Sequence, residues 1–261
     1  MRKERYYYLI RLQYLGYRYS GWQKQPGHKT VEGMLVKTLK FILPDLSFKI
    51  LGAGRTDAKV SAMDMAFELF LDDGSLADLE YFKEEFNKNL PPDIRILSIE
   101  KVSREFNIIK DSKTKEYLYL FSFGEKNHPF CAPFLANILE ELDIALMIKC
   151  ANLFVGTHDF STYTARLQPN TKVIRTIDTC QIKKNTVLKA NFFPATSYAL
   201  HISGAGFMRY QIRMIMGALI QVGKGELTLA DIEASLENAN GITLTYVAPG
   251  SGLMLYDLEF E

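Results

Sequence analysis

The chain has 261 residues, a formal net charge of +1 and 48% hydrophobic residues. This length suits one large domain or two small ones, and the composition predicts a packed core and excludes a disordered chain. No apolar run is long enough to span a bilayer, and residues 1–30 lack the pattern of a signal peptide. We therefore expect a cytoplasmic protein.

Three cysteines, Cys131, Cys150 and Cys180, lie far apart, and the four histidines are scattered. An odd number of separated cysteines predicts neither a disulfide framework nor a pair of metal ligands, and it fits a reducing compartment. The scattered histidines suggest no metal site either.

Charge is segregated along the chain. Residues 1–30 hold seven Lys or Arg and one acid, and residues 161–224 hold nine Lys or Arg and one acid. Residues 64–100 carry ten acids and three bases, and residues 226–261 carry seven acids and no Lys or Arg. Two basic blocks predict a positive face that binds a polyanion; ordinary solvated charge is the alternative.

The first hundred residues carry strand and helix patterns in the order β-α-β-β-α-β, which is typical of a ferredoxin-like unit. Thr30 is the expected N-cap of the first helix, and Ser75 with Asp78 resembles a capping box before the second. The expected strands are 6–14, 47–52, 63–71 and 94–102, and the expected helices are 30–42 and the segment from the capping box to Leu90, stopped by Pro91-Pro92.

The second half repeats this order, with strands at 115–123, 172–183, 187–203 and 253–260 and helices at 140–155, 207–222 and 228–239. We therefore predict a mixed α/β (α+β) fold of two ferredoxin-like halves, 1–104 and 105–261. Their antiparallel sheets would lie side by side, and a central cleft would hold the active site.

The segment Gly52-Ala53-Gly54-Arg55-Thr56-Asp57-Ala58 places a carboxylate two residues after an arginine and behind two glycines. Glycines allow a tight turn, and the nearby arginine would keep Asp57 ionised, so the segment predicts a reactive anion at a loop tip. The alternative is a surface turn with a local ion pair.

Three further segments could carry chemistry. Tyr117 follows two lysines at the start of a strand, so it could stack on a base, or it could simply fill a sheet face. Arg213 lies in an apolar helix, where an arginine needs an anionic partner or must extend its head into water. The loop at residues 16–25 mixes aromatic, basic and amide groups, as a nucleic-acid contact would; a packed loop anchored by Trp22 is the alternative.

Together these pieces resemble the TruA family of tRNA pseudouridine synthases over nearly the whole chain. The resemblance rests on Gly21-Trp22-Gln23, Gly54-Arg55-Thr56-Asp57-Ala58, Lys115-Glu116-Tyr117-Leu118-Tyr119, Gly156 to Ser161, Phe207 to Gly217, and Ala248 to Leu253. It implies that Asp57 is the catalytic aspartate with Arg55 as its partner, that Tyr117 packs on the target base, and that Arg213 pairs with the carboxylate. It also implies a homodimer that binds tRNA and uses no cofactor or metal.

The side chains that we expect to contact RNA are Arg18, Gln23, Lys24, Lys59, Lys113, Lys115, Arg166 and Arg209. The chain departs from the family's pattern at Lys59-Val60-Ser61, where Gly-Val-His is usual, at Leu15, where aspartate is frequent, and at Ile109, where arginine is common. The expected substrate is the set of uridines in the anticodon stem-loop of tRNA. The alternatives are a different RNA site, a non-catalytic RNA-binding or RNA-folding protein, and a small-molecule enzyme on the same scaffold.

Overall fold

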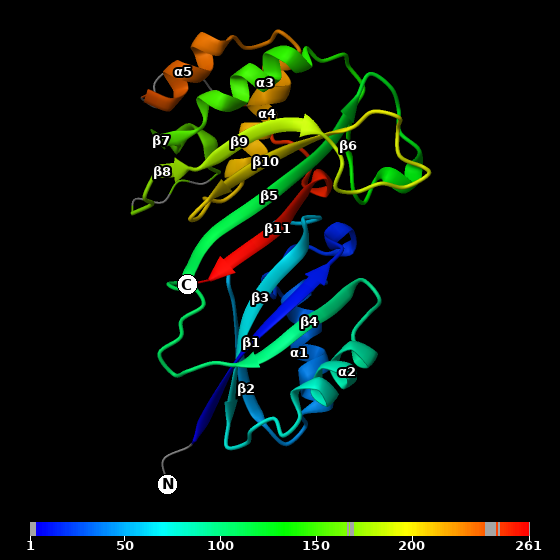
Figure 1. Ribbon diagram of the computed structural model, residues 1–261, viewed down its shortest axis with the longest axis vertical. Coiled ribbons are helices and arrows are strands. Elements are labelled where there is room, and N and C mark those ends of the chain that lie inside the picture. Colours follow the sequence, from blue (N-terminus) through cyan, green and yellow to red (C-terminus); the bar gives the residue numbers. More distant parts are fainter. Residues whose placement is uncertain (1–3, 166, 168–169, 238–243, 245, 261) are drawn as a thin grey trace. The chain divides into compact units, whose positions relative to one another are not determined.

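The structure is a computed structural model that describes residues 4–165, 167, 170–237, 244 and 246–260 (Figure 1). Its chain divides into two compact units. Unit 1 comprises Met1–Lys113 and Leu255–Glu261, and unit 2 comprises Thr114–Met254. Strands and helices occur in both units, which confirms the predicted mixed α/β class.

Unit 1 has the predicted β-α-β-β-α-β order. Its elements are β1 (Arg5–Tyr14), α1 (Val31–Ile42), β2 (Ser47–Gly52), β3 (Ser61–Asp72), α2 (Leu79–Asn89) and β4 (Ile94–Lys101), with a 3-10 turn η1 (Gly16–Arg18) after β1. The strands run β4-β1-β3, and both β2 and the last strand β11 (Leu253–Phe260) lie beside β3. Strands β1 and β2 both pair antiparallel with β3, and they lie along its opposite edges.

The core of unit 1 lies on both faces of β3, because residues 65–69 are buried without a break. Ile10 lies opposite Phe67 in the register, and both are fully buried, as are Leu35 of α1 and Phe86 of α2. Thr30 caps α1 as predicted, because its side chain accepts a hydrogen bond from the Gly33 N–H group.

The expected cap of the second helix is wrong by one turn. The helix begins at Leu79, after Asp78, whose carboxylate accepts a hydrogen bond from the Tyr81 N–H group. Ser75 lies outside the helix. A single N-cap aspartate is enough to satisfy this helix end, so the reciprocal bond of a capping box is not needed.

The second face of the unit 1 sheet is covered by the segment after β4. Ile108 is fully buried there in a cluster with Leu9, Ala66 and Leu258. The segment 103–113 therefore belongs with unit 1, whose first stretch of chain ends at Lys113.

Unit 2 is built on three antiparallel strands with helices α3, α4 and α5 (Figure 1). The order is β5-β10-β9, and β7 and β8 form a separate pair. The elements are β5 (Ser112–Phe123), β6 (Ala136–Ile138), α3 (Ile144–Leu153), β7 (Gly156–Asp159), β8 (Ile174–Ile177), β9 (Thr179–Lys184), β10 (Tyr198–Gly204), α4 (Gln211–Gly223) and α5 (Leu229–Glu237), with 3-10 turns η2 (Pro129–Cys131), η3 (Ser161–Tyr163) and η4 (Gly250–Gly252).

Two predicted strands of the second half are wrong in extent. Residues 187–197 are not a strand, because the Asn185 side chain bonds to the Val187 N–H group and the Leu188 carbonyl, which turns the chain out of the sheet. Residues 172–183 are not one strand either, since β8 ends at Ile177 and β9 begins at Thr179.

Two predicted helix starts have different outcomes. The expected helix 207–222 begins at Gln211, because Tyr210 adopts a left-handed conformation with φ of 63°. The expected start of the helix 228–239 is confirmed, because Thr228 and Asp231 exchange side-chain to backbone hydrogen bonds. The end of that expected helix, at residues 238–239, lies outside the described residues.

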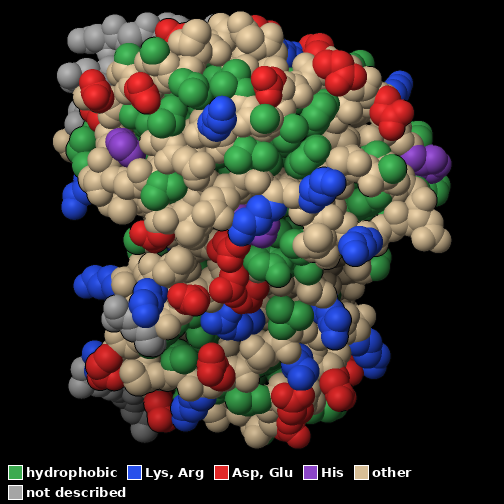
Figure 2. Space-filling view, turned by 45° about the horizontal axis from the view of Figure 1, so that its top comes forward, with side chains coloured by type: hydrophobic (Ala, Val, Ile, Leu, Met, Phe, Trp, Pro, Cys, Tyr) green, Lys and Arg blue, Asp and Glu red, His purple; other side chains and the backbone are tan. Residues whose placement is uncertain are grey.

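The strand register brings the first basic block onto the acidic block. Arg5 forms an ion pair with Asp72 at 2.7 Å, and Arg11 forms one with Asp64. The face drawn in Figure 2 accordingly shows acidic and basic side chains intermixed. Charge that is segregated in the sequence is thus partly neutralised in space, and a single positive face stays a prediction.

Candidate active site

Asp57 lies in the loop between β2 and β3, which we call the Asp57 loop and define as residues 53–60. Thr56 and Val60 are buried, Asp57 is half-buried, and Arg55 is exposed. The loop therefore has buried anchors on both sides of a carboxylate that reaches the surface.

The segment after β1 holds the Asp57 loop through its backbone. The Trp22 N–H group donates to the Thr56 carbonyl at 3.0 Å, and the Lys59 N–H group donates to the Tyr19 carbonyl at 3.1 Å. The hydroxyls of Tyr14 and Thr56 are also hydrogen-bonded, at 2.9 Å. These bonds pin the residues on each side of Asp57. A reactive anion and a local ion pair at this turn both stay predictions.

Two glycines allow this close approach. Gly21 has φ of 93°, and a Cβ atom there would lie 2.7 Å from the Thr56 carbonyl oxygen. A Cβ atom on Gly52 would lie 2.7 Å from the indole of Trp22, which is only 2% exposed. The alternative interpretation of residues 16–25, a packed loop anchored by Trp22, therefore holds for its aromatic anchor.

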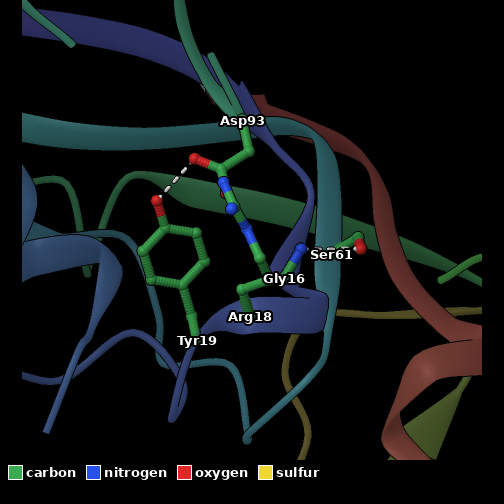
Figure 3. Close-up of polar contacts among 5 residues, drawn as sticks. All are labelled: Gly16, Arg18, Tyr19, Ser61 and Asp93. Carbon is green, nitrogen blue, oxygen red and sulfur yellow. Dashed lines mark hydrogen bonds and ion pairs between the residues drawn. The ribbon is translucent and has the colours of Figure 1, made fainter. Parts of the chain in front are cut away.

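Polar contacts also hold the segment after β1 that bonds to the Asp57 loop, as Figure 3 shows. The Gly16 N–H group donates to the Ser61 hydroxyl at 2.9 Å, so Ser61 has a local role where the family often carries histidine. Arg18 and the Tyr19 hydroxyl both donate to Asp93, at 2.6 Å and 2.7 Å. Partial burial opposes ionisation of Asp93, yet the bonds from Tyr19 and Arg18 hold its pKa below the ordinary value.

The predicted RNA contacts of unit 1 have different surroundings. Arg18 is ion-paired with Asp93, although its side chain stays 61% exposed. The Gln23 amide and the Lys24 N–H group donate to the Glu32 carboxylate, while the Lys24 side chain is exposed. Both side chains are thus exposed, and that of Arg18 is also held by an ion pair.

Lys59 departs from ordinary backbone geometry. Its φ is 67°, in the left-handed region that glycine adopts most easily. This conformation accounts for glycine at the matching position of the TruA pattern. The exposed ammonium group of Lys59 lies 5.6 Å from the centre of the Tyr17 ring. A cation over an aromatic ring is a favourable contact, and it leaves the charge at the rim of the Asp57 loop.

Tyr117 lies in the middle of β5 and belongs to unit 2. Its ring is half-buried and packs edge-on against Phe207, with 5.4 Å between ring centres. Tyr119 and Phe121, on the same face of the strand, are fully buried. Tyr117 and Phe123, at the two ends of this aromatic row, are thus half-buried, whereas Tyr119 and Phe121 between them fill the core.

Arg213 lies in the first turn of α4, and its surroundings are specific. Its Nε–H group donates to the Ala248 carbonyl at 2.7 Å, and its guanidinium carbon lies 4.9 Å from the centre of the Tyr210 ring. The alternative of an arginine that merely extends its head into water does not describe this geometry. The sequence analysis missed Tyr210 and Ala248, although Tyr210 is three residues before Arg213, a spacing that makes neighbours on a helix.

The remaining predicted RNA contacts lie around these elements. Lys113 is exposed at the end of unit 1, and Arg209 is exposed with its guanidinium carbon 5.1 Å from the Tyr210 ring centre. Lys115, on the same face of β5 as Tyr117, is half-buried, and this burial lowers the pKa of its ammonium group. Arg166 lies outside the described residues.

The predicted residues therefore form two groups. Asp57, Arg55 and Lys59 share one loop of unit 1, and Tyr117, Arg213 and most of the helix motif belong to unit 2. Within the described ranges, no three His, Cys, Asp or Glu side chains come together in a way that could hold a metal ion. In the same ranges, no helix is long and apolar enough to cross a membrane.

Comparisons with known proteins cover nearly the whole chain. A family model described as tRNA pseudouridine synthase matches residues 150–261. A protein named tRNA pseudouridine synthase A from Thermodesulfovibrio yellowstonii is 31% identical over 248 residues, which cover 94% of this chain and 95% of the relative. Relatives of the same name from Dictyoglomus thermophilum and Mesoplasma florum are 31% and 32% identical, and the alignments cover 96% and 97% of this chain and 98% of each relative.

Proposed function

We propose that this chain, which belongs to the tRNA pseudouridine synthase A family of isomerases, converts uridines in the anticodon stem-loop of tRNA into pseudouridine. Asp57 is the proposed catalytic carboxylate. The observation that carries this proposal is the Asp57 loop, where hydrogen bonds through Thr56 and Lys59 hold a half-buried carboxylate between two fixed anchors. Precise placement of a reacting group is what such a loop supplies.

The reaction exchanges one bond for another within the same nucleotide. The glycosidic C–N bond breaks, the uracil turns, and a C–C bond forms. The proton on the ring carbon leaves, and the ring nitrogen released from the sugar takes up a proton, so the product is an isomer of the substrate. Asp57 acts either as a nucleophile or as a base, at the sugar or at the uracil ring. The positive charges of Arg55 and Arg213 keep the carboxylate ionised and oriented.

Tyr117 provides the proposed platform for the target base. Its ring is partly accessible and is braced by Phe207. Removing a base from its stack costs a few kcal/mol of free energy, and stacking on an aromatic ring offsets about 1–3 kcal/mol of that cost. The Tyr117 hydroxyl could then assist removal of the proton from the ring carbon. The proposal requires both groups of residues to act on one uridine, so the central cleft expected from the sequence stays a prediction.

The proposed contacts with RNA phosphates are Arg18, Gln23, Lys24, Lys59, Lys113, Lys115, Arg166 and Arg209. Exposure of Lys24, Lys59 and Arg209 supports their part in this set. Because each phosphate contact releases counterions, affinity for tRNA should fall steeply as salt rises. We further propose that the protein acts as a homodimer, in line with the family resemblance.

The test compares wild type with Asp57→Asn and with the control Asp45→Asn, whose side chain is exposed in the turn between α1 and β2. The assay measures tritium release from bulk tRNA labelled at uracil carbon 5, together with tRNA affinity. We expect release by wild type and Asp45→Asn, none by Asp57→Asn, and similar affinity for all three. No release by folded wild type that still binds tRNA would favour a non-catalytic RNA-binding protein or a different RNA site. Equal loss of release and binding in Asp57→Asn would make Asp57 structural.

A further inference from the structure

Tyr210 occupies an unusual backbone position at the start of α4. It is the N-cap residue, with φ of 63° and ψ of 2°, and its side chain makes no capping hydrogen bond. A residue with a Cβ atom rarely adopts this left-handed conformation, and a bulky aromatic residue is a true outlier there. Glycine would fit this backbone better, and serine or aspartate would cap the helix better.

The ring of Tyr210 contacts two guanidinium groups. Its centre lies 4.9 Å from the guanidinium carbon of Arg213 and 5.1 Å from that of Arg209. A guanidinium group over an aromatic face is held by the ring quadrupole and by stacking. The strained backbone of Tyr210 therefore places an aromatic surface directly against Arg213.

The other side of Arg213 is also fixed. Its Nε–H group donates to the Ala248 carbonyl at 2.7 Å, and its own carbonyl accepts a bond from the Ala248 N–H group at 3.0 Å. Helix α4 packs tightly on this segment, because a Cβ atom on Gly217 would lie 2.1 Å from the Tyr246 carbonyl oxygen. The Ala248 carbonyl and the Tyr210 ring together restrict the orientation of the Arg213 guanidinium plane.

The turn that leads into Tyr210 is locked as well. The Gln211 side-chain oxygen accepts a hydrogen bond from the Met208 N–H group at 2.8 Å, and Gln211 is almost fully buried. The Arg209 carbonyl accepts bonds from Thr164 and Ala165 of the segment after η3. These contacts hold the left-handed conformation in place, as a surrounding structure must when backbone strain persists.

We propose that Tyr210 is a positioning residue, whose strained backbone and ring hold the Arg213 guanidinium in the orientation that uridine isomerisation requires. This inference rests on the proposed function, in which Arg213 orients the catalytic carboxylate. It explains why a tyrosine, poorly suited to its backbone and inactive as a cap, stands at the start of α4.

The test uses Tyr210→Gly and Tyr210→Phe in the full chain. Tyr210→Gly removes the ring and relieves the strain, so its urea midpoint should equal or exceed that of wild type. Its single-turnover rate of tritium release should nevertheless fall at least tenfold, with tRNA affinity within about threefold of wild type. Tyr210→Phe keeps the ring and should restore most of the rate.

A double variant separates positioning from a general structural effect. Arg213→Lys replaces the planar guanidinium by an ammonium group that the ring cannot orient in the same way. If Tyr210 acts through Arg213, Tyr210→Gly should change the rate of Arg213→Lys less than twofold. A full tenfold loss in that background would overturn the inference, as would a wild-type rate for Tyr210→Gly alone. If wild type itself releases no tritium, the proposed function fails and this inference falls with it.

Discussion

The strain at Lys59 gives a prediction that can be worked out from the structure. The φ of 67° strains both lysine and alanine, which have a Cβ atom, and glycine adopts it without this strain. Lys59→Ala keeps the strain and loses the ammonium group, whereas Lys59→Gly loses both. The pair therefore isolates the backbone contribution at one position of the Asp57 loop.

Lys59→Gly should be more stable than Lys59→Ala by about 1 kcal/mol in the free energy of unfolding. A left-handed conformation costs a residue with a Cβ atom about 1–2 kcal/mol. Glycine loses about 0.5–1 kcal/mol more chain entropy than alanine on folding, which removes part of the gain. Wild type should exceed Lys59→Ala by about 0.5–1 kcal/mol, because its ammonium group lies over the exposed Tyr17 ring.

Urea unfolding followed by tryptophan fluorescence measures this difference. The chain has one tryptophan, Trp22. Its backbone N–H group donates to the Asp57 loop, so its emission reports on unit 1. Both variants lose the same charge, so both should weaken tRNA binding equally and lower the salt slope by about 1. Equal stability of Lys59→Ala and Lys59→Gly would refute the strain argument, and unequal tRNA binding would refute the assignment of the contact to the ammonium group.

Two further predictions concern the supports of the loop. Gly52→Ala puts a Cβ atom 2.7 Å from the Trp22 indole, so it should destabilise unit 1 by about 1–3 kcal/mol and shift the tryptophan emission. Gly206→Ala, with open space around its Cβ position, should leave that emission unchanged; a shift in both would point to a general effect. Asp93 has a pKa below its ordinary value in the folded state, so its stabilising contribution is present at neutral pH and is lost as the pH falls below about 4. Asp93→Asn should therefore be less stable than wild type at pH 7, and the gap should narrow in acid; a gap independent of pH would contradict this.

Local patterns predicted most of the fold. The position of β3 and the cap at Thr30 each depend on residues close in the sequence, so one chain suffices to recognise them. The extent of β10 was not predictable in this way, because side-chain bonds of Asn185 compete with the sheet.

The position of the Asp57 loop was predictable from the sequence, and its supports were not. The sequence places Asp57 between two strands, and the structure agrees. The left-handed conformations of Lys59 and Tyr210 depend on contacts with distant segments, which no local propensity encodes. The pairing of Arg18 with Asp93 likewise follows from tertiary structure, since the two residues are 75 positions apart.

The measurement that tests the central claim most directly is mapping of pseudouridine in tRNA after incubation with wild type or Asp57→Asn. Mass spectrometry of nuclease fragments would locate each new pseudouridine. Our account predicts new pseudouridine in the anticodon stem-loop with wild type and none with Asp57→Asn. Pseudouridine formed equally by both proteins, or none formed by folded wild type, would contradict it.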